Sequence, residues 1–280
     1  MNITQLRNAT IIVDIGGHRI LVDPMLAPSG AIPPLKYATR SRRRNPLVEL
    51  PVNAHAELET VTHCLITHCQ KGHFDHLDRA GARWLRQHDI PVYCIAEDAD
   101  FLARKGLSVV PLQPGLRQAF LGGELTPVPC LHGRGLVGRF MAHGHGYFLE
   151  FPGEPSVYIA GDTILTDDVR RCILRNQPDV CVVPAGGANF DIGGEIIMGV
   201  DDVQAVTRIS TGTVVANHLE SLDHCPVTRD QIRAMGAQES LGTRLRVPDD
   251  GETLEFSTTA SPQSSAEAPP IPVLTEELDG

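Results

Sequence analysis

The chain has 280 residues, enough for one large domain or two small ones, and its composition is that of an ordinary globular protein. Its formal net charge of -10 repels phosphate backbones and argues against broad nucleic-acid binding. No apolar run approaches the roughly 20 residues that span a membrane, and residues 1–10 lack the features of a signal peptide. Seven cysteines without a CxxC pair indicate reduced thiols, so we expect a cytoplasmic protein.

The first part of the chain predicts a β-hairpin followed by a long irregular loop. The apolar runs Thr10–Asp14 and Arg19–Asp23 flank a Gly-Gly turn, which is typical of a hairpin. Residues 25–55 then hold five prolines and a basic cluster that includes Arg42 and Arg43. Long loops are often functional, so these two arginines are candidate contacts for an anionic substrate; a solvated charge run is the alternative.

The stretch Val61–Asp78 is the most informative part of the sequence. Its first half, Val61–Thr67, is an apolar run typical of a buried strand. From residue 68 onward, three histidines and two aspartates follow within eleven residues. A strand that leads directly into several metal-ligand side chains predicts a functional site.

The remaining elements fall into two groups of strands, each accompanied by helices. We predict helices at residues 79–88, 98–105, 166–174, 201–209 and 228–235, and strands at 91–96, 108–112, 118–121, 124–130, 147–151, 156–160, 179–184 and 212–216, with a closing hairpin over 245–257. This pattern favours an α+β fold, a four-layer αββα sandwich over residues 1–257. Residues 257–270 are rich in Ser, Ala and Pro, so we predict a flexible tail over 258–280, whose more apolar end, residues 271–280, could dock on the body or on a partner.

Three later strands also end in a residue that can bind a metal. The runs LTPVPCLH, SVYIAGD and GTVVANH end at His132, Asp162 and His218. Strand ends that meet at one edge of a sandwich would bring seven side chains together: His68, His73, Asp75, His76, His132, Asp162 and His218. Five imidazoles and two carboxylates suit two divalent ions, zinc first and manganese or iron as alternatives, with Asp162 as the bridge.

This ordered set of residues resembles the metallo-β-lactamase superfamily, whose fold is the αββα sandwich. The Leu-Val-Asp-Pro segment, the Pro184–Gly187 turn and the segment after His218 are most similar to its lactonase-type hydrolases, related to ascorbate-phosphate lactonase. The resemblance covers roughly residues 5 to 257. It implies that His68, His73 and His132 hold one ion, that Asp75, His76 and His218 hold the second, and that Asp162 is shared.

The resemblance also implies a reaction. Hydroxide generated at the metal site would attack an ester, lactone, thioester or phosphoester bond of a small molecule, and Asp75 would orient this nucleophile. His224 lies six residues past His218, and it is either a proton donor to the leaving group or a histidine hydrogen-bonded within its loop. Gly187 is a further candidate substrate contact, and the sequence leaves open whether the protein is a homo-oligomer.

The sequence departs from the family pattern at one place. Members usually have a single residue between the first two histidines, whereas residues 69–72 separate His68 from His73 here. Gly72 would allow the enlarged loop to fold back so that both histidines point inward. Whether His68 reaches the metal depends on the path of this insertion.

Two other functions are compatible with the sequence. The chain could be a binding or scaffold protein in which the metals only stabilise the fold and the tail is a docking peptide. It could also be an iron-containing oxidoreductase of the same fold. A full set of seven ligands favours the hydrolase, because one closed four-ligand zinc site would stabilise a fold equally well.

Overall fold

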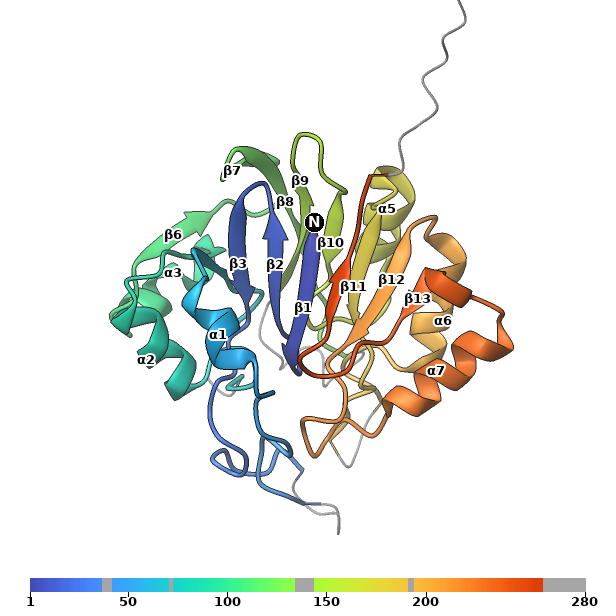
Figure 1. Cartoon of the computed structure of the whole chain (residues 1–280), viewed down its shortest axis with the longest axis horizontal. Helices are drawn as coiled ribbons and strands as arrows, with labels where there is room; N and C mark the ends of the chain where they lie inside the picture. The colour runs from blue at the N-terminus through green and yellow to red at the C-terminus, as the bar shows by residue number, and fades with distance from the viewer. Residues whose placement is uncertain (37–41, 71–72, 134–143, 191–193, 259–280) are drawn as a thin grey trace, which may run out of the picture.

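Two seven-stranded sheets face each other in the centre of the protein (Figure 1). The computed structural model describes residues 1–36, 42–70, 73–133, 144–190 and 194–258. The first sheet has the strand order β14-β1-β2-β3-β4-β5-β6, and the second has the order β13-β12-β11-β10-β9-β8-β7. The sandwich predicted from the sequence is therefore confirmed.

The first sheet is antiparallel at one side and parallel at the other. β14, β1, β2 and β3 pair antiparallel, while β3 to β6 run parallel. The carboxyl ends of the parallel strands therefore meet at one edge of the sheet. Its strands are β1 (Asn2–Arg7), β2 (Thr10–Ile15), β3 (His18–Val22), β4 (His63–Leu65), β5 (Val92–Ile95), β6 (Val109–Leu112) and β14 (Thr253–Glu255).

The second sheet repeats this division. β7 to β10 are antiparallel, and β10 to β13 are parallel. Its strands are β7 (Gln118–Phe120), β8 (Gly123–Pro129), β9 (His145–Glu150), β10 (Val157–Ile159), β11 (Val180–Pro184), β12 (Thr213–Asn217) and β13 (Leu245–Arg246).

Helices cover the outer face of each sheet and complete four layers (Figure 1). The first sheet carries α1 (Ala54–Glu59), α2 (Arg79–Gln87) and α3 (Ala96–Ala103). The second carries α5 (Asp167–Asn176), α6 (Val200–Ile209) and α7 (Arg229–Gln238), followed by the short 3₁₀ helix η1 (Gly242–Arg244). None of the helices in the described ranges is long and apolar enough to cross a membrane.

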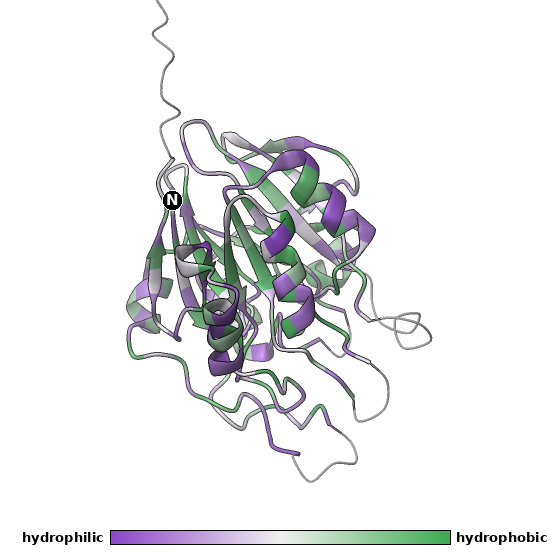
Figure 2. Ribbon diagram, turned by 90° about the vertical axis from the view of Figure 1, so that its right-hand side faces the viewer, coloured by the Kyte–Doolittle hydropathy of each residue, from purple (hydrophilic) through white to green (hydrophobic). Residues whose placement is uncertain are grey.

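Side-chain alternation explains why both faces of each strand are apolar. In β2, Ile11 and Val13 belong to the core between the sheets, whereas Ile12 packs under α1 and α2. In β11, Val182 faces the central core and Val183 faces the layer of α5 to α7. Successive strand residues point to opposite faces, so a strand buried on both sides is apolar throughout. Figure 2 shows these apolar strands enclosed by helices of mixed polarity.

Three details of the fold differ from the sequence prediction. The hairpin expected over residues 245–257 is wrong, because β13 pairs with β12 in the second sheet and β14 pairs with β1 in the first. The loop expected over 25–55 ends in a short helix, α1, which begins at Ala54, and neither α1 nor the first strand, β1, was predicted. The predicted tail lies outside the described residues, apart from Thr258.

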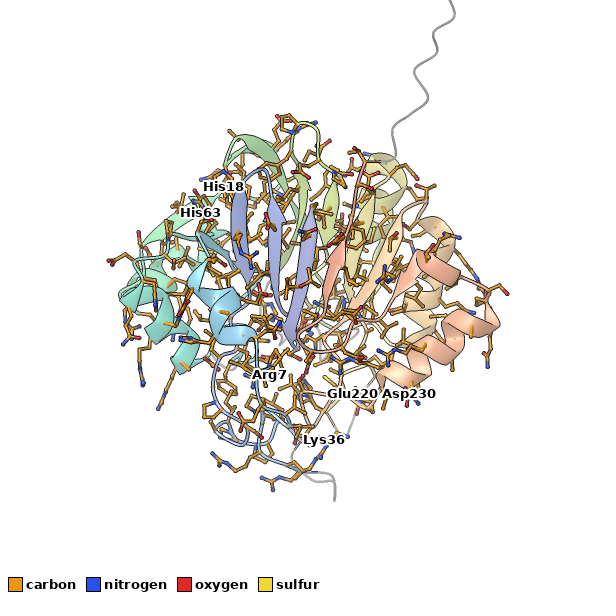
Figure 3. All side chains as sticks on the ribbon, in the orientation of Figure 1. Arg7, His18, Lys36, His63, Glu220 and Asp230 are labelled. Carbon is orange, nitrogen blue, oxygen red and sulfur yellow. The ribbon has the colours of Figure 1, made fainter. Side chains whose placement is uncertain are left out.

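Arg7, at the end of β1, is fully buried and fixes the loop that follows β3. Its guanidinium donates hydrogen bonds to the carbonyls of Met25 at 2.6 Å, Ala27 at 2.9 Å and Val48 at 3.0 Å. Figure 3 labels Arg7 beside α1, above this loop. Burial lowers the pKa of Arg7 to about 10, and the side chain remains charged at pH 7. One residue of the first strand thus holds both ends of the loop.

Replacing Arg7 tests this anchor. We expect Arg7→Met to lower the free energy of unfolding by about 3 kcal/mol, because three carbonyls lose a charged donor in a buried place. Urea denaturation monitored by circular dichroism measures the change. The control Arg171→Met, on the exposed face of α5, should stay within about 0.5 kcal/mol of the unchanged protein. Equal stability of the two variants would contradict this role for Arg7.

Candidate metal centre

The seven predicted ligands converge at the edge where the carboxyl ends of the parallel strands meet. They come from four separate segments, each directly after a strand. His68 and the His73–His76 turn follow β4, His132 follows β8, Asp162 follows β10 and His218 follows β12. All are buried except His73, which is half-buried.

Three histidines form the first group of potential ligands. One nitrogen atom from each of His68, His73 and His132 lies within 4.8 Å of the other two. Their ring centroids are separated by 4.7, 5.4 and 5.7 Å. Three imidazole nitrogens at this spacing can hold one metal ion and leave a position open for water or substrate.

The insertion after His68 does not remove this histidine from the group. Gln70 Nε2 donates to Asp98 Oδ1 on α3 at 3.1 Å, and the carbonyl of Gln70 accepts a hydrogen bond from His73 N at 3.0 Å. Cys69 is buried in the core beneath α2. These contacts direct the chain back toward the site, while Gly72 lies outside the described residues.

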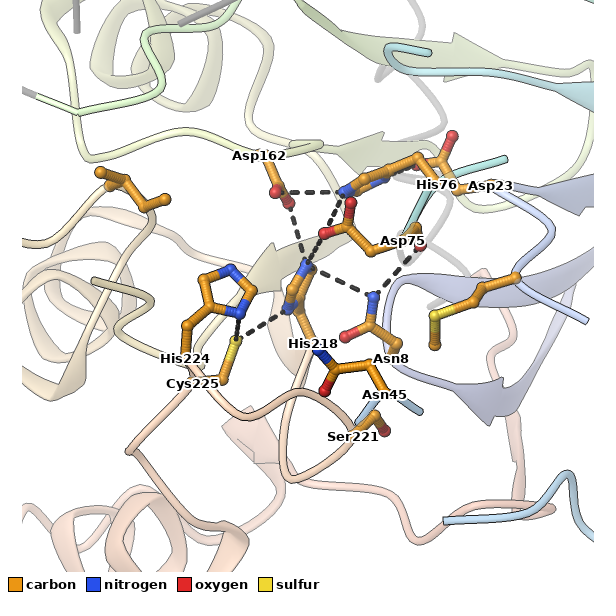
Figure 4. A network of polar contacts seen from close by, with 12 residues as sticks. Asn8, Asp23, Asn45, Asp75, His76, Asp162, His218, Ser221, His224 and Cys225 are labelled. Carbon is orange, nitrogen blue, oxygen red and sulfur yellow. Dashed lines mark hydrogen bonds and ion pairs between the residues drawn. The ribbon is translucent and has the colours of Figure 1, made fainter. Parts of the chain in front are cut away.

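Two carboxylates and two imidazoles form the second group. One atom from each of Asp75, His76, Asp162 and His218 lies within 4.8 Å of the other three. His218 Nε2 is 3.6 Å from Asp75 Oδ2 and 3.5 Å from Asp162 Oδ1 (Figure 4). His76 Nε2 is 3.6 Å from Asp75 Oδ2 and 3.1 Å from Asp162 Oδ2.

Asp162 lies between the two groups. Its Oδ2 atom is also 3.6 Å from His132 Nε2 and 4.0 Å from His68 Nε2. A carboxylate in this position can contribute one oxygen to each of two neighbouring ions. Asp162 therefore faces both groups, and its role as a bridging ligand stays a prediction.

Burial keeps the first group neutral. It lowers the pKa of His68 and His73, and it lowers the pKa of His132 to about 4. Neutral imidazoles retain the lone pair that a metal requires, so these three side chains are ready to bind an ion at pH 7.

The second group is held together by opposite charges. Burial alone would lower the pKa of His76 and His218, but nearby carboxylates, Asp162 first, outweigh it and raise both values well above the usual one. Burial would raise the pKa of Asp75 and Asp162, yet the same two histidines hold both pKa values low. A bound cation would replace the protons of these histidines as the positive charge facing the carboxylates.

Four buried atoms of the cluster fit this replacement. His68 Nε2, His73 Nδ1, His76 Nε2 and Asp162 Oδ1 lack a hydrogen bond of good geometry within the part of the chain that the structure describes, although His76 and Asp162 lie within ion-pair distance of their neighbours. An unsatisfied buried polar atom costs about 1–3 kcal/mol, which coordination of a cation would offset. The donors, imidazole nitrogens and carboxylate oxygens, are those that zinc, iron and manganese accept.

Asp23 supports the site and was not recognised as a functional residue from the sequence. Its carboxylate accepts hydrogen bonds from the backbone N and the Oγ1 of Thr67, at 2.8 and 2.6 Å. Oδ2 also lies 2.9 Å from Nδ1 of His76, so the opposite nitrogen of that ring faces Asp162 (Figure 4). Such carboxylate partners fix the orientation of a ligating imidazole. Asp23 follows a strand directly, which is the signal that identified the other aspartates.

Backbone and sulfur contacts orient two further histidines. Nδ1 of His132 donates to the carbonyl of Ile196 at 2.7 Å. The backbone N of His218 donates to the carbonyl of Asn8 at 3.0 Å, and Sγ of Cys225 lies 3.6 Å from Nδ1 of the same histidine. In both rings Nε2 is left to face Asp162, so Cys225 lies on the far side of His218 from the cluster.

The remaining predicted site residues are placed differently. Arg42 and Arg43 are exposed, and Gly187 is a tightly packed residue whose backbone N donates to the Met198 carbonyl at 2.9 Å. A side chain at 187 would meet Val227 at 2.7 Å. Substrate contact by these three residues stays a prediction.

His224 lies beside the second group. It is buried, its ring stacks on Phe190 at 5.6 Å with an interplanar angle of 13°, and its Nδ1 is 4.0 Å from Sγ of Cys225. Burial alone would lower the pKa of His224, but Cys225 outweighs it and raises the value. The ring is therefore held in a fixed orientation between Phe190 and Cys225.

Asp223 ties the loop after β3 to the segment that carries His218 and His224. Its buried carboxylate accepts hydrogen bonds from the backbone N of Leu35 at 3.0 Å, Lys36 at 3.3 Å and Arg43 at 3.4 Å. The side chain of Asn45 donates to the same carboxylate at 3.0 Å and accepts from Asp223 N at 2.9 Å. Residues 35, 36, 43 and 45 of the loop are therefore fixed beside the segment that carries the two histidines.

The contact between Asp23 and His76 can be tested through metal affinity. We expect Asp23→Asn to weaken binding of zinc about 10- to 100-fold, because the ring of His76 loses the carboxylate that orients it. Isothermal titration calorimetry on metal-depleted protein measures the affinity. The control Asp14→Asn, on the more exposed part of β2, should bind zinc as before. If the two variants bind zinc equally well, Asp23 does not orient a ligand.

The chain is similar to one known domain family and to curated proteins over most of its length. The profile described as the Beta-lactamase superfamily domain matches residues 18–219. The UPF0173 protein YddR of Bacillus subtilis is 31% identical over 262 residues, which are 91% of this chain and all of that protein. A UPF0173 metal-dependent hydrolase of Azorhizobium caulinodans is 29% identical over 91% of this chain and its own full length.

A solved structure agrees with these relatives. The isothiocyanate hydrolase from Delia radicum gut bacteria superimposes with a TM-score of 0.83 and is 31% identical, covering 92% of this chain and all of that protein. The chain therefore belongs to the metallo-β-lactamase superfamily.

Proposed function

We propose that the chain is a metal-dependent hydrolase that cleaves an ester, lactone, thioester or phosphoester bond of a small molecule. The observation that carries this proposal is the pair of ligand groups that share Asp162, three histidines on one side and Asp75, His76 and His218 on the other. A purely structural metal site needs only four closed ligands, whereas two open groups leave room for water and substrate.

The donor atoms favour two divalent ions, zinc first, with manganese or iron as alternatives. His68, His73 and His132 would hold one ion, Asp75, His76 and His218 the other, with Asp162 shared. Such ions lower the pKa of a coordinated water toward about 7 and polarise the bond under attack. The donors come from four strand ends in a rigid sandwich, so their spacing is set before the substrate arrives.

Two residues have proposed roles in the reaction itself. Asp75 is a buried carboxylate whose pKa is held low by His76 and His218, so it can accept a hydrogen bond from the attacking water and orient it. His224 is buried next to this group and its raised pKa supports a proton donor to the leaving group. Stacking on Phe190 would keep the imidazole aligned for that transfer.

The surroundings of the site support a substrate with an apolar part. Leu35 and Phe190 pack on a buried cluster that includes Ile32, Ile196 and Leu222, beside the segment that carries His224. Hydrolysis of an isothiocyanate is a second candidate reaction, favoured by the 31% identity to the isothiocyanate hydrolase over almost the whole chain. In each reaction water attacks an electrophilic centre, so the residue roles above apply to both.

The other functions considered for this sequence make different predictions. A scaffold with structural metals would turn over none of these substrates, and an iron-containing oxidoreductase would be coloured when purified. For the hydrolase, we also propose that Arg42, Arg43 and Gly187 contact the substrate and that the substrate is anionic.

Replacing Asp75 tests the catalytic proposal. A panel of lactones, thioesters, phosphodiesters and isothiocyanates first identifies the compounds that the unchanged protein hydrolyses. On these compounds we expect Asp75→Ala to lower kcat/KM by at least about 100-fold. Circular dichroism should show an intact fold. The control Asp14→Ala should retain full activity. Undiminished turnover by the Asp75 variant would overturn its assignment.

A series of esters with different leaving groups tests His224. We expect His224→Gln to slow hydrolysis of alkyl esters about 100-fold or more and to leave nitrophenyl esters within about fivefold, because a good leaving group needs no proton. Single-turnover rates across the series provide the measurement. A uniform loss for all esters would show that His224 only supports the structure.

A further inference from the structure

The outer face of α2 borders a groove separate from the metal centre. The groove has a volume of about 400 Å³, and four of the eight residues that line it are basic. Arg79, Arg83 and Arg86 come from α2, and Lys105 follows α3. In a chain with a net charge of -10, this concentration of positive charge indicates attraction of a negatively charged partner.

The spacing of the three arginines aligns their charges. Positions 79, 83 and 86 are separated by four and three residues, so they lie along one face of the helix. They span about 10 Å of its axis, since each residue rises by 1.5 Å. Arg86 Nη1 donates to the carbonyl of Lys105 at 2.9 Å, which keeps the last arginine beside the lysine. Within the described ranges of the chain, none of these four side chains pairs with a carboxylate.

The floor of the groove is apolar. It contains Phe74, Leu77 and Ala82, and the ring of Phe74 is 38% exposed although it precedes a buried aspartate. The acidic lining residue, Asp78, is buried and is engaged as the cap of α2, where it accepts hydrogen bonds from Gly81 N and from Ala27 N, both at 2.6 Å. The groove thus combines an apolar base with unopposed positive charge.

One segment of this chain has the complementary chemistry. Residues 271–279 read IPVLTEELD, with four apolar residues followed by three carboxylates at Glu276, Glu277 and Asp279. We propose that this segment docks in the groove, its apolar part against Phe74 and Leu77 and its carboxylates along the basic face of α2. In an extended segment the three carboxylates span about 10 Å, which matches the span of the arginines.

The length of the intervening chain permits this contact. Residues 258–270, rich in Ser, Ala and Pro, reach about 45 Å when fully extended. A domain of this size has a radius of gyration of about 18 Å, so the segment can reach the groove of its own chain or of a second copy. Docking against Phe74 would place the segment beside the metal centre, because Phe74 directly precedes Asp75 in the sequence. The interaction itself does not depend on the hydrolytic function.

Site-directed photo-crosslinking in the full chain tests the contact. With p-benzoylphenylalanine in place of Leu274, we expect irradiation to join the segment to peptides that contain residues 74–86, identified by mass spectrometry. Arg83→Ala combined with Arg86→Ala should reduce the yield at least fivefold. The control pair Arg171→Ala and Arg175→Ala, on α5, should leave the yield unchanged.

Exchange of charges distinguishes docking from chance proximity. Glu276→Lys with Glu277→Lys should abolish the crosslink, and adding Arg83→Glu with Arg86→Glu should restore it. A crosslinked product of monomer size indicates docking on the same chain, and one of dimer size indicates docking on a second copy. The proposal fails if the crosslinks map elsewhere, or if the charge reversals leave their yield unchanged.

Discussion

The carboxylate of Asp162 lies within 4.0 Å of imidazole nitrogens from four other positions of the chain, His68, His76, His132 and His218. This arrangement requires the edges of both sheets to coincide, because the histidines follow strands of each sheet. The direction of the strands provides the constraint. In the second sheet β8, β10 and β12 run the same way, and in the first sheet β4 runs parallel to its neighbours, so the residues that follow these strands lie at one edge. The fold therefore determines where the chemistry occurs.

The strand-end signal explains how much of the site could be predicted. His68, His132, Asp162 and His218 follow apolar runs directly, the other three residues come shortly after the first of these runs, and the structure brings all seven together. Asp23 follows the same rule, but the adjacent Pro24 made it resemble a simple strand stop. The partners of Asp162 and the position of Gln70 depend on tertiary contacts, such as that of Gln70 with Asp98, which no local pattern reveals.

The fold was predictable where apolar runs agreed with turn or cap residues. It was ambiguous where a turn sequence was the only signal. The hairpin of β2 and β3 and the capped helix α7 were identified correctly, since apolar runs and the Thr228 cap are local signals. The turn at Asp249–Gly251 lies in the middle of the hairpin predicted over residues 245–257. The strands on its two sides belong to different sheets. A turn sequence specifies a reversal of the chain but not the partner of the strands on either side.

The anchoring of the loop after β3 has a consequence for how this protein could change over time. Among the described residues, three of the four groups that donate to the Asp223 carboxylate are backbone N–H groups, from residues 35, 36 and 43, and backbone groups are present whatever the side chain, except for proline. Mutations in this loop can therefore alter the surface it presents without releasing the loop from its anchor. Substitutions there can change the surface beside the site while the metal cluster and its supporting contacts keep their positions.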